Sequence, residues 1–314
     1  MNRRQFLKRS VAALAAPAAW KALAAAAPAR QAAASRANKM KRIGCTTVCF
    51  LMRFPQTRPK KAPKTGPDFR LPDMPAMFAE KLGVHNVEMW SLHFEQTTEA
   101  YCKKLRAAAK KAGSRIFNVQ LDSPGYNLSQ TDPAARKKSI QFVERWMDRA
   151  AACGATSLRA NTGGGRRKLD LRITGDAFAR LAEHGKSIGV KILVENHGGY
   201  SSNPDNVVAI MKHVNSPWCR TLPDFGNMPG NFTQAQRNEF LGKLMPYAHM
   251  ISAKGMYFDK QLKHSPYDIG ACVRFAEKAK FKGIYSAERW SPRPIAVDDL
   301  TATRRIIELI VANL

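Results

Sequence analysis

A carboxylate follows directly after an apolar run in the segment KILVENHGGY at 191–200. The apolar residues 192–194 are typical of a buried strand, and an unpaired carboxylate is costly in a core. Glu195 and His197 are two residues apart, so in a strand both side chains point to the same side. A carboxylate and an imidazole on one side of a strand could move protons or bind a cation.

The same pattern recurs where other apolar runs end, each closing with a charged or hydrogen-bonding residue. These residues are Glu88 and Trp90 in VEMW, Gln120 and Asp122 in VQLD, Arg159 and Asn161 in LRAN, Asp224 and Asn227 in PDFGN, Ser252 and Lys254 in SAKG, and Glu288 and Trp290 in SAERW. A single polar residue at the end of an apolar run could be an accident of packing. Six further segments with a polar residue at the same end of the run indicate a functional site.

Three of the strand-end residues are carboxylates that would repel one another if they met without a counter-charge: Glu195, Asp224 and Glu288. A divalent cation would remove that repulsion, and oxygen ligands with an imidazole suit Mn²⁺, Mg²⁺ or Zn²⁺. Basic neighbours are the alternative counter-charges, namely Lys254, Arg159 and Arg289. The sequence favours one divalent metal and leaves the alternative open.

These positions require a scaffold of alternating strands and helices. Strands are predicted at 42–50, 86–92, 114–121, 157–161, 191–195, 219–223, 250–253 and 283–287, and helices at 100–112, 139–152, 176–188, 206–214, 234–245, 267–279 and 298–311. Alternation of strands and helices about eight times predicts an α/β fold, a single (β/α)8 TIM barrel, whose chemistry lies at the carboxyl ends of the strands. No GxGxxG follows the first strand, which argues against a nucleotide-binding sheet.

The N-terminal sequence resembles a targeting signal. Residues 1–27 have a basic start, an alanine-rich apolar stretch and an RRQFLK motif typical of a twin-arginine export signal, so we expect a periplasmic protein. Residues 28–40 are expected to be a linker and 41–314 the barrel. No later stretch approaches the roughly 20 apolar residues of a membrane span, and the six scattered cysteines form no CxxC pair.

The chain is strongly basic, with a net charge of +27, of which the first 27 residues carry five positive charges and no acid. A mature charge of +22 could attract an anionic glycan, although a solvated basic surface explains it equally well. We expect no nucleic-acid partner, and the oligomeric state is open.

At the strand-end residues the chain resembles the xylose isomerase-like, or sugar phosphate isomerase/epimerase, superfamily of TIM barrels. The resemblance spans the mature chain and rests on VENHGG, PDFGN, the segment before AKGMYFD, and SAERW. It implies that Glu195, Asp224 and Glu288 hold one divalent metal and that Glu195 and Glu288 form the acid/base pair. It also implies a small sugar or glycoside substrate, contacted by Glu88, Trp90, Arg159, Asn161, Asn227, Ser252 and Trp290.

One position departs from the family pattern. The family has a histidine ligand on the seventh strand, whereas Ser252 stands at that place and His249 faces the other way by strand parity. Three interpretations follow: three carboxylates and water hold the metal, His197 supplies the nitrogen, or the site is metal-free with Lys254 balancing the acids. The first two together are favoured.

The implied reaction is proton transfer beside the carbonyl or hydroxyl of a sugar, with the metal or Lys254 stabilising the enediolate oxygen. Export favours a free sugar, keto-sugar or glycoside over a sugar phosphate. The alternatives are a catalytically inactive glycan-binding barrel and a 3-keto-glycoside lyase or hydratase variant of the same site. An endonuclease IV-like DNA repair enzyme is the least favoured, because it needs a histidine-rich three-zinc site.

Overall fold

The computed structural model describes residues 34–314 except 65, 165–167 and 291–296, so the predicted export signal at 1–27 lies outside the described residues. The chain forms two units, Met1–Met40 and Lys41–Leu314. In the first unit the described residues 34–40 are helical. All the elements that follow belong to the second unit.

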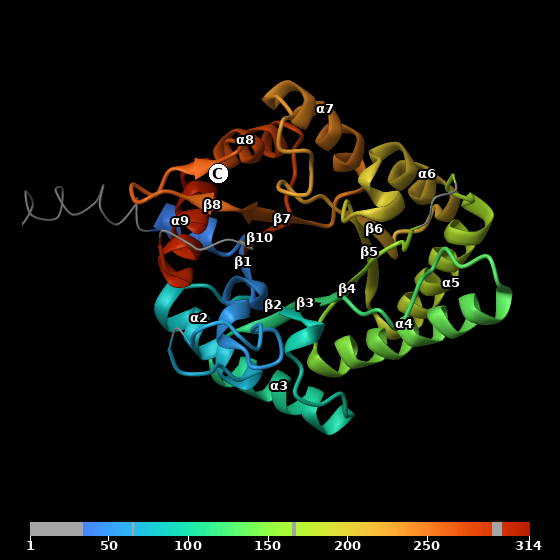
Figure 1. The fold of residues 1–314 in the computed structure, drawn as a ribbon, viewed down its shortest axis with the longest axis horizontal. Helices are drawn as coiled ribbons and strands as arrows, with labels where there is room; N and C mark the ends of the chain where they lie inside the picture. Colours follow the sequence, from blue (N-terminus) through green and yellow to red (C-terminus); the bar gives the residue numbers. More distant parts are fainter. Residues whose placement is uncertain (1–33, 65, 165–167, 291–296) are drawn as a thin grey trace, which may run out of the picture. The chain divides into compact units, whose positions relative to one another are not determined.

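Eight parallel strands form a barrel, which confirms the predicted fold (Figure 1). They are β1 (Ile43–Thr46), β2 (Asn86–Trp90), β3 (Arg115–Leu121), β4 (Ser157–Ala160), β5 (Lys191–Glu195), β6 (Cys219–Leu222), β7 (Met250–Gly255) and β10 (Ile284–Arg289). Hydrogen-bonded neighbours run in the order β6-β5-β4-β3-β2-β1-β10-β7. The isolated parallel bridges Thr221↔Ala248 and Asp224↔Ser252 close the ring between the β6 and β7 segments.

Helices surround the strands (Figure 1). They are α2 (Met74–Leu82), α3 (Glu99–Lys111), α4 (Pro133–Cys153), α5 (Leu171–Ile188), α6 (Pro204–Val214), α7 (Gln234–Leu244), α8 (Ile269–Lys278) and α9 (Asp299–Ala312). Aspartate side chains cap the first turns of α4, α5, α8 and α9 by accepting from backbone N–H groups. Glycines in the left-handed region, Gly83, Gly154 and Gly189, end α2, α4 and α5. No helix of the described residues is long and apolar enough to cross a membrane.

Short elements fill the connections. Five 3-10 helices, η1 (Thr47–Arg53), η2 (Leu71–Asp73), η3 (Ser91–His93), η4 (Gly199–Ser202) and η5 (Met245–Tyr247), join the described strands and helices. The strands β8 (Tyr257–Phe258) and β9 (His264–Ser265) pair in a small antiparallel hairpin. The predicted first strand at 42–50 is too long, because the Thr46 side chain accepts from the Val48 N–H and turns the chain into η1.

An apolar floor lies below the predicted site. Phe117, Leu193, Leu222 and Met250 form a buried cluster against which Ile284 packs. A Cβ at Gly44 would lie 2.9 Å from the Phe117 ring, so β1 needs glycine where that ring fills the floor. Because side chains two residues apart share a face, Leu193, Leu222 and Met250 lie in the floor while Glu195, Asp224 and Ser252 lie above it. On β3 the register shift between Ile116 and Asn118 leaves Phe117 without a register partner on β2, so Phe117 packs in the floor although Asn118 and Gln120 also face inward.

Candidate active site

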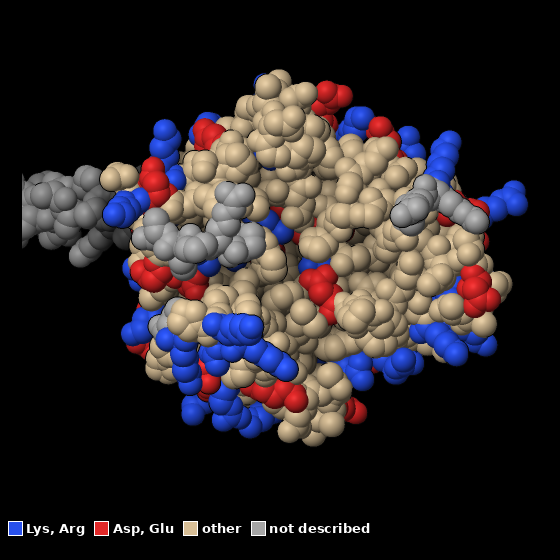
Figure 2. Space-filling model, in the orientation of Figure 1, with Lys and Arg blue, Asp and Glu red and all other residues tan. Residues whose placement is uncertain are grey.

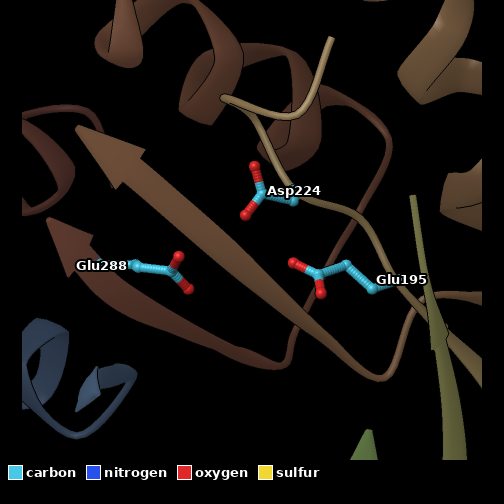
Figure 3. A group of neighbouring side chains, drawn as sticks. All are labelled: Glu195, Asp224 and Glu288. Atoms are coloured by element: carbon cyan, nitrogen blue, oxygen red, sulfur yellow. The ribbon is translucent and has the colours of Figure 1, made fainter. Parts of the chain in front are cut away.

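Three carboxylates meet above the floor. Glu195 ends β5, Asp224 follows β6 and Glu288 lies near the end of β10. One carboxylate oxygen from each lies within 4.8 Å of the others, and all three residues are buried. Figure 3 shows the three side chains pointing toward one another from three separate segments of the chain. The sequence pattern identified this convergence, because all three residues close strands whose carboxyl ends share one end of the barrel.

Lys254 of β7 extends into the same group of carboxylates. Its Nζ lies 2.9 Å from Glu288 Oε1 and 3.3 Å from Asp224 Oδ2, and it donates to Asn227 Oδ1 at 2.8 Å. Burial alone would lower the pKa of Lys254, but Asp224, Glu288 and Glu195 outweigh it and hold the pKa well above the ordinary value. The side chain is therefore a fixed positive charge.

Glu288 is held by donors on both of its oxygens. Besides the contact with Lys254, its Oε2 accepts from Gln120 Nε2 at 2.9 Å and from Ser252 Oγ at 3.2 Å. Thr46 in turn donates to Gln120 Oε1, which fixes the amide orientation. Burial would raise the pKa of Glu288, but Lys254 and the hydrogen bonds hold it below the ordinary value, so this carboxylate is ionised.

Asp224 is positioned by its backbone and by its own turn. Asn196 accepts from the Asp224 N–H at 2.7 Å and donates to the Asp224 carbonyl at 3.0 Å. The Oδ1 atom accepts from the N–H groups of Gly226 and Asn227. Burial, together with the charges of Glu195 and Glu288, raises the pKa of Asp224 to about 7.

Glu195 lies between an arginine and an amide. Arg159 Nε is 2.9 Å from Glu195 Oε2 in a geometry too bent for a hydrogen bond, and Asn227 Nδ2 donates to Oε1 at 3.2 Å. Burial raises the pKa of Glu195 despite the opposing charges of Arg159 and Lys254. Its nearest cation is as close as that of Glu288, at 2.9 Å in both cases, but Glu288 accepts hydrogen bonds from more donors.

Asp122 organises the rim beside Glu195. It accepts a bidentate contact from Arg159 at 2.6 and 3.1 Å, together with hydrogen bonds from Asn161 Nδ2 and Trp90 Nε1. Burial would raise the pKa of Asp122, but the Arg159 charge dominates and holds the pKa well below the ordinary value. Arg159, Asn161 and Trp90 are thus brought together through a residue that the sequence placed at a strand end without assigning it to the site.

The remaining predicted site residues are Trp90, Trp290, His197 and Glu88, which lie outside the group of three carboxylates. The rings of Trp90 and Trp290 meet edge to face, with centroids 6.3 Å apart. His197 is half-buried, and burial with the charges of Arg159 and Lys254 lowers its pKa. Glu88 is fully buried, where it accepts from Asn118 and Ser286 instead of facing the other carboxylates.

Sequence reasoning gave no role to three side chains that hold this arrangement: Gln120 and Asp122, which it named only as strand ends, and Asn196, which it did not name. Gln120 and Asp122 stand out as polar strand ends, and contact between neighbouring strands could have linked them to Glu288 and Arg159. Asn196 lies on the opposite strand face from Glu195 by parity, so no periodic pattern points to it.

The donor chemistry of the cluster suits a divalent cation. Among the described residues, the group of His, Cys, Asp and Glu side chains close enough to share an ion is Glu195, Asp224 and Glu288, and His197 is not part of it. Glu195 Oε2 and Asp224 Oδ2 are buried and accept no hydrogen bond within the described part of the chain, and each has only an ion-pair contact there, with Arg159 and Lys254 respectively. The carboxylates therefore fit a metal, provided that Lys254 Nζ moves away from two of them.

The basic side chains considered as counter-charges divide into two groups. Lys254 and Arg159 contact the carboxylates, whereas Arg289 pairs with Asp299 of α9.

The sequence profile of a family described as xylose isomerase-like TIM barrel matches residues 77–310. The chain therefore belongs to the xylose isomerase-like TIM barrel family, as the strand-end motifs predict. None of the curated proteins matches the chain.

Solved structures share the fold at low sequence identity. A xylose isomerase-like TIM barrel protein from Mycobacterium smegmatis in complex with magnesium has a TM-score of 0.60 and 17% identity, covering 87% of this chain and 97% of that one. A D-psicose 3-epimerase in the presence of D-fructose has a TM-score of 0.62 and 13% identity, with 87% and 96% covered. A 3-keto-D-glucoside 4-epimerase from E. coli has a TM-score of 0.63 and 12% identity, with 85% and 98% covered.

Proposed function

We propose that the protein is an isomerase- or epimerase-like enzyme that moves a proton at a carbon next to the carbonyl of a free sugar, keto-sugar or glycoside. The observation that carries the proposal is the pair Glu195 and Glu288, which face one space from β5 and β10 with opposite electrostatic surroundings. Membership in the xylose isomerase-like family and the sugar epimerases among its structural neighbours support it.

The environments assign a role to each carboxylate. Glu288 is kept ionised by Lys254, Gln120 and Ser252, so it suits proton removal, whereas Glu195 has a raised pKa and suits proton delivery. The base takes the proton from carbon, the electron pair passes to the carbonyl oxygen, and the acid returns a proton. Return to the opposite face gives epimerisation, and return to the neighbouring carbon gives isomerisation.

A cation beside the developing oxygen charge lowers the barrier of such a reaction. A divalent metal held by Glu195, Asp224 and Glu288 would polarise the substrate oxygen as a Lewis acid. Because the three donors are carboxylate oxygens and His197 lies outside the group, Mg²⁺ or Mn²⁺ suits this set better than Zn²⁺. Lys254 is the other cation within reach of the same oxygens.

The rim suits a neutral sugar ring. Trp290 is half-buried and packs edge to face on the buried ring of Trp90, which donates to Asp122. An amphipathic ring such as that of Trp290 could stack on the apolar face of a pyranose. We further propose that the protein is exported by the twin-arginine route, which favours unphosphorylated substrates. Lys and Arg side chains occupy much of the periphery of the face in Figure 2 and could attract an anionic glycan.

Solvent deuterium exchange tests the proposal. The enzyme is incubated in D₂O with D-psicose, D-fructose and a 3-keto-glucoside, and deuterium at carbon is followed by NMR and mass spectrometry. Glu195→Gln and Glu288→Gln should each slow exchange by about 10²- to 10⁴-fold. Glu80→Gln, at a residue 70% exposed beside Lys81, is the matched control and should exchange like the parent.

Two outcomes would contradict the proposal. If either site variant exchanges at the parent rate, the acid/base assignment is wrong. If no sugar exchanges but a glycan still binds, the protein is an inactive glycan-binding barrel, which the loss of the family histidine at Ser252 favours as the second candidate. Loss of a β-substituent during exchange would identify the lyase or hydratase variant.

A further inference from the structure

A lysine ammonium group already occupies the space among the three carboxylates. Lys254 Nζ contacts Glu288 Oε1 at 2.9 Å and Asp224 Oδ2 at 3.3 Å, and its third partner is the neutral Asn227 Oδ1 at 2.8 Å. The residue is only 5% exposed, so water cannot solvate its ammonium group unless the side chain leaves the barrel interior. A buried ammonium needs such partners to remain charged.

A divalent ion and this ammonium group compete for the same oxygens. A metal bound by the carboxylates would lie about 2.0–2.6 Å from their oxygens. Glu288 Oε1 and Asp224 Oδ2 already lie 2.9 and 3.3 Å from Lys254 Nζ, so a metal on these two atoms would share them with the ammonium group. Two like charges that share an oxygen lie at most about 6 Å apart, a separation at which they repel even in a polar protein environment. The presence of Lys254 therefore weakens the binding of a divalent ion to this cluster.

Ser252, on the same strand, points to the same conclusion. It stands where the family resemblance places a nitrogen ligand, two residues before Lys254, so both side chains share a strand face. Its Oγ donates to Glu288 Oε2 at 3.2 Å and thereby stabilises the carboxylate that Lys254 contacts. The strand thus combines a residue unsuited to bind metal with one that supplies a positive charge.

We propose that Lys254 is the resident cation of this site, occupying the position of a divalent ion and stabilising the enediolate oxygen without metal. The catalytic part of this inference rests on the proposed sugar chemistry, whereas the competition with metal does not. A substrate oxygen would replace Asn227 Oδ1, the one neutral acceptor among the three, so the contacts with Asp224 and Glu288 are kept while the oxygen gains negative charge.

Manganese binding to the full chain tests the competition directly. Metal-free parent protein, Lys254→Met and Lys260→Met are titrated with Mn²⁺ by calorimetry, and bound Mn²⁺ is checked by electron paramagnetic resonance. Lys254→Met should bind Mn²⁺ more than about tenfold tighter than the parent, because the repelling charge is gone. Lys260→Met removes one exposed positive charge outside the site and should bind like the parent. Equal affinity of all three proteins would overturn the proposal.

Deuterium exchange by the chelator-treated parent protein provides a second measurement that needs no variant. Exchange at an undiminished rate without metal supports Lys254 as the resident cation. Exchange that stops on chelation and returns with Mn²⁺ or Mg²⁺ would overturn it and leave the roles of Glu195 and Glu288 intact. Failure of every sugar to exchange under both conditions would instead remove the proposed function, while the Mn²⁺ titration would still decide which cation the cluster holds.

Discussion

Replacing the deepest carboxylate of the barrel, Glu88, with glutamine should remove a pH dependence of stability. Glu88 is fully buried on β2, where its oxygens accept from Asn118 Nδ2 at 2.6 Å and from Ser286 Oγ. Burial raises its pKa from 4.5 to about 8, against the hydrogen bonds that favour the ionised form. The folded protein therefore holds a neutral acid here at pH 7. Glu88→Gln keeps its shape and the hydrogen bond from Asn118, while the Ser286 hydroxyl turns to accept from the new amide.

The magnitude follows from proton linkage. Between pH 4.5 and 8 the unfolded chain loses the Glu88 proton while the folded protein keeps it, so folding stability falls as pH rises through this range. Each pH unit costs about 1.4 kcal/mol, so the full interval amounts to at most roughly 5 kcal/mol. The loss is absent below the unfolded pKa and complete above the folded one. Glutamine does not titrate, so this contribution vanishes in the variant.

Urea unfolding of both proteins at several values between about pH 4.5 and 8.5 measures the effect. The stability of Glu88→Gln relative to the parent should grow with pH by at least about 2 kcal/mol over this interval. Taking the difference cancels the titration of Asp224 and Glu195, which both proteins share. A difference that stays constant with pH would refute the assignment of a neutral Glu88.

Three other substitutions test the supporting contacts. Asp122→Asn removes the charge that balances Arg159 and should lower the free energy of unfolding in urea by about 2–4 kcal/mol. It should also raise the KM for the sugar. An unchanged KM would show that the Asp122 network does not contact the substrate. Asn196→Ala breaks both hydrogen bonds to the Asp224 backbone and should cost about 1–3 kcal/mol per unpaired group, with slower deuterium exchange in the folded variant. Gly185→Ala would place a Cβ 2.1 Å from a carbonyl oxygen, so its Tm should fall; a Tm equal to the parent's would contradict this packing.

The barrel could be predicted because each strand and helix has a local signal. Apolar runs that end in a polar residue predict seven of the eight strands, and Gly83 and Gly189 lie where α2 and α5 end. The end of the first strand was mispredicted, because the apolar residues after Thr46 belong to η1, where burial rather than strand pairing explains them. Hydrophobicity alone does not separate a buried strand from a buried 3-10 turn.

The sequence could predict which strand ends meet in the site, but not which side chains pair there. Strand parity places Glu195 and Glu288 on inward faces, but the partner of each carboxylate depends on distances that parity does not supply. The assignment of Lys254 to Glu288, and of Arg159 to both Glu195 and Asp122, required the folded geometry. A bulge also shifts the pairing register between β2 and β3, and no sequence pattern predicts this shift.

The ring closes in two different ways around Lys254. On one side, β7 pairs with β10 in a continuous parallel ladder in which Lys254 lies directly opposite Glu288. On the other side, two isolated bridges join the β6 and β7 segments, and the Lys254 contact of 3.3 Å with Asp224 crosses this joint. Three backbone hydrogen bonds hold the joint: His249 N–H to Thr221 O, Ser252 N–H to Pro223 O, and Phe225 N–H to Ser252 O. A shift of the β6 segment would therefore change the distance from the ammonium group to Asp224 and leave its distance to Glu288 unchanged.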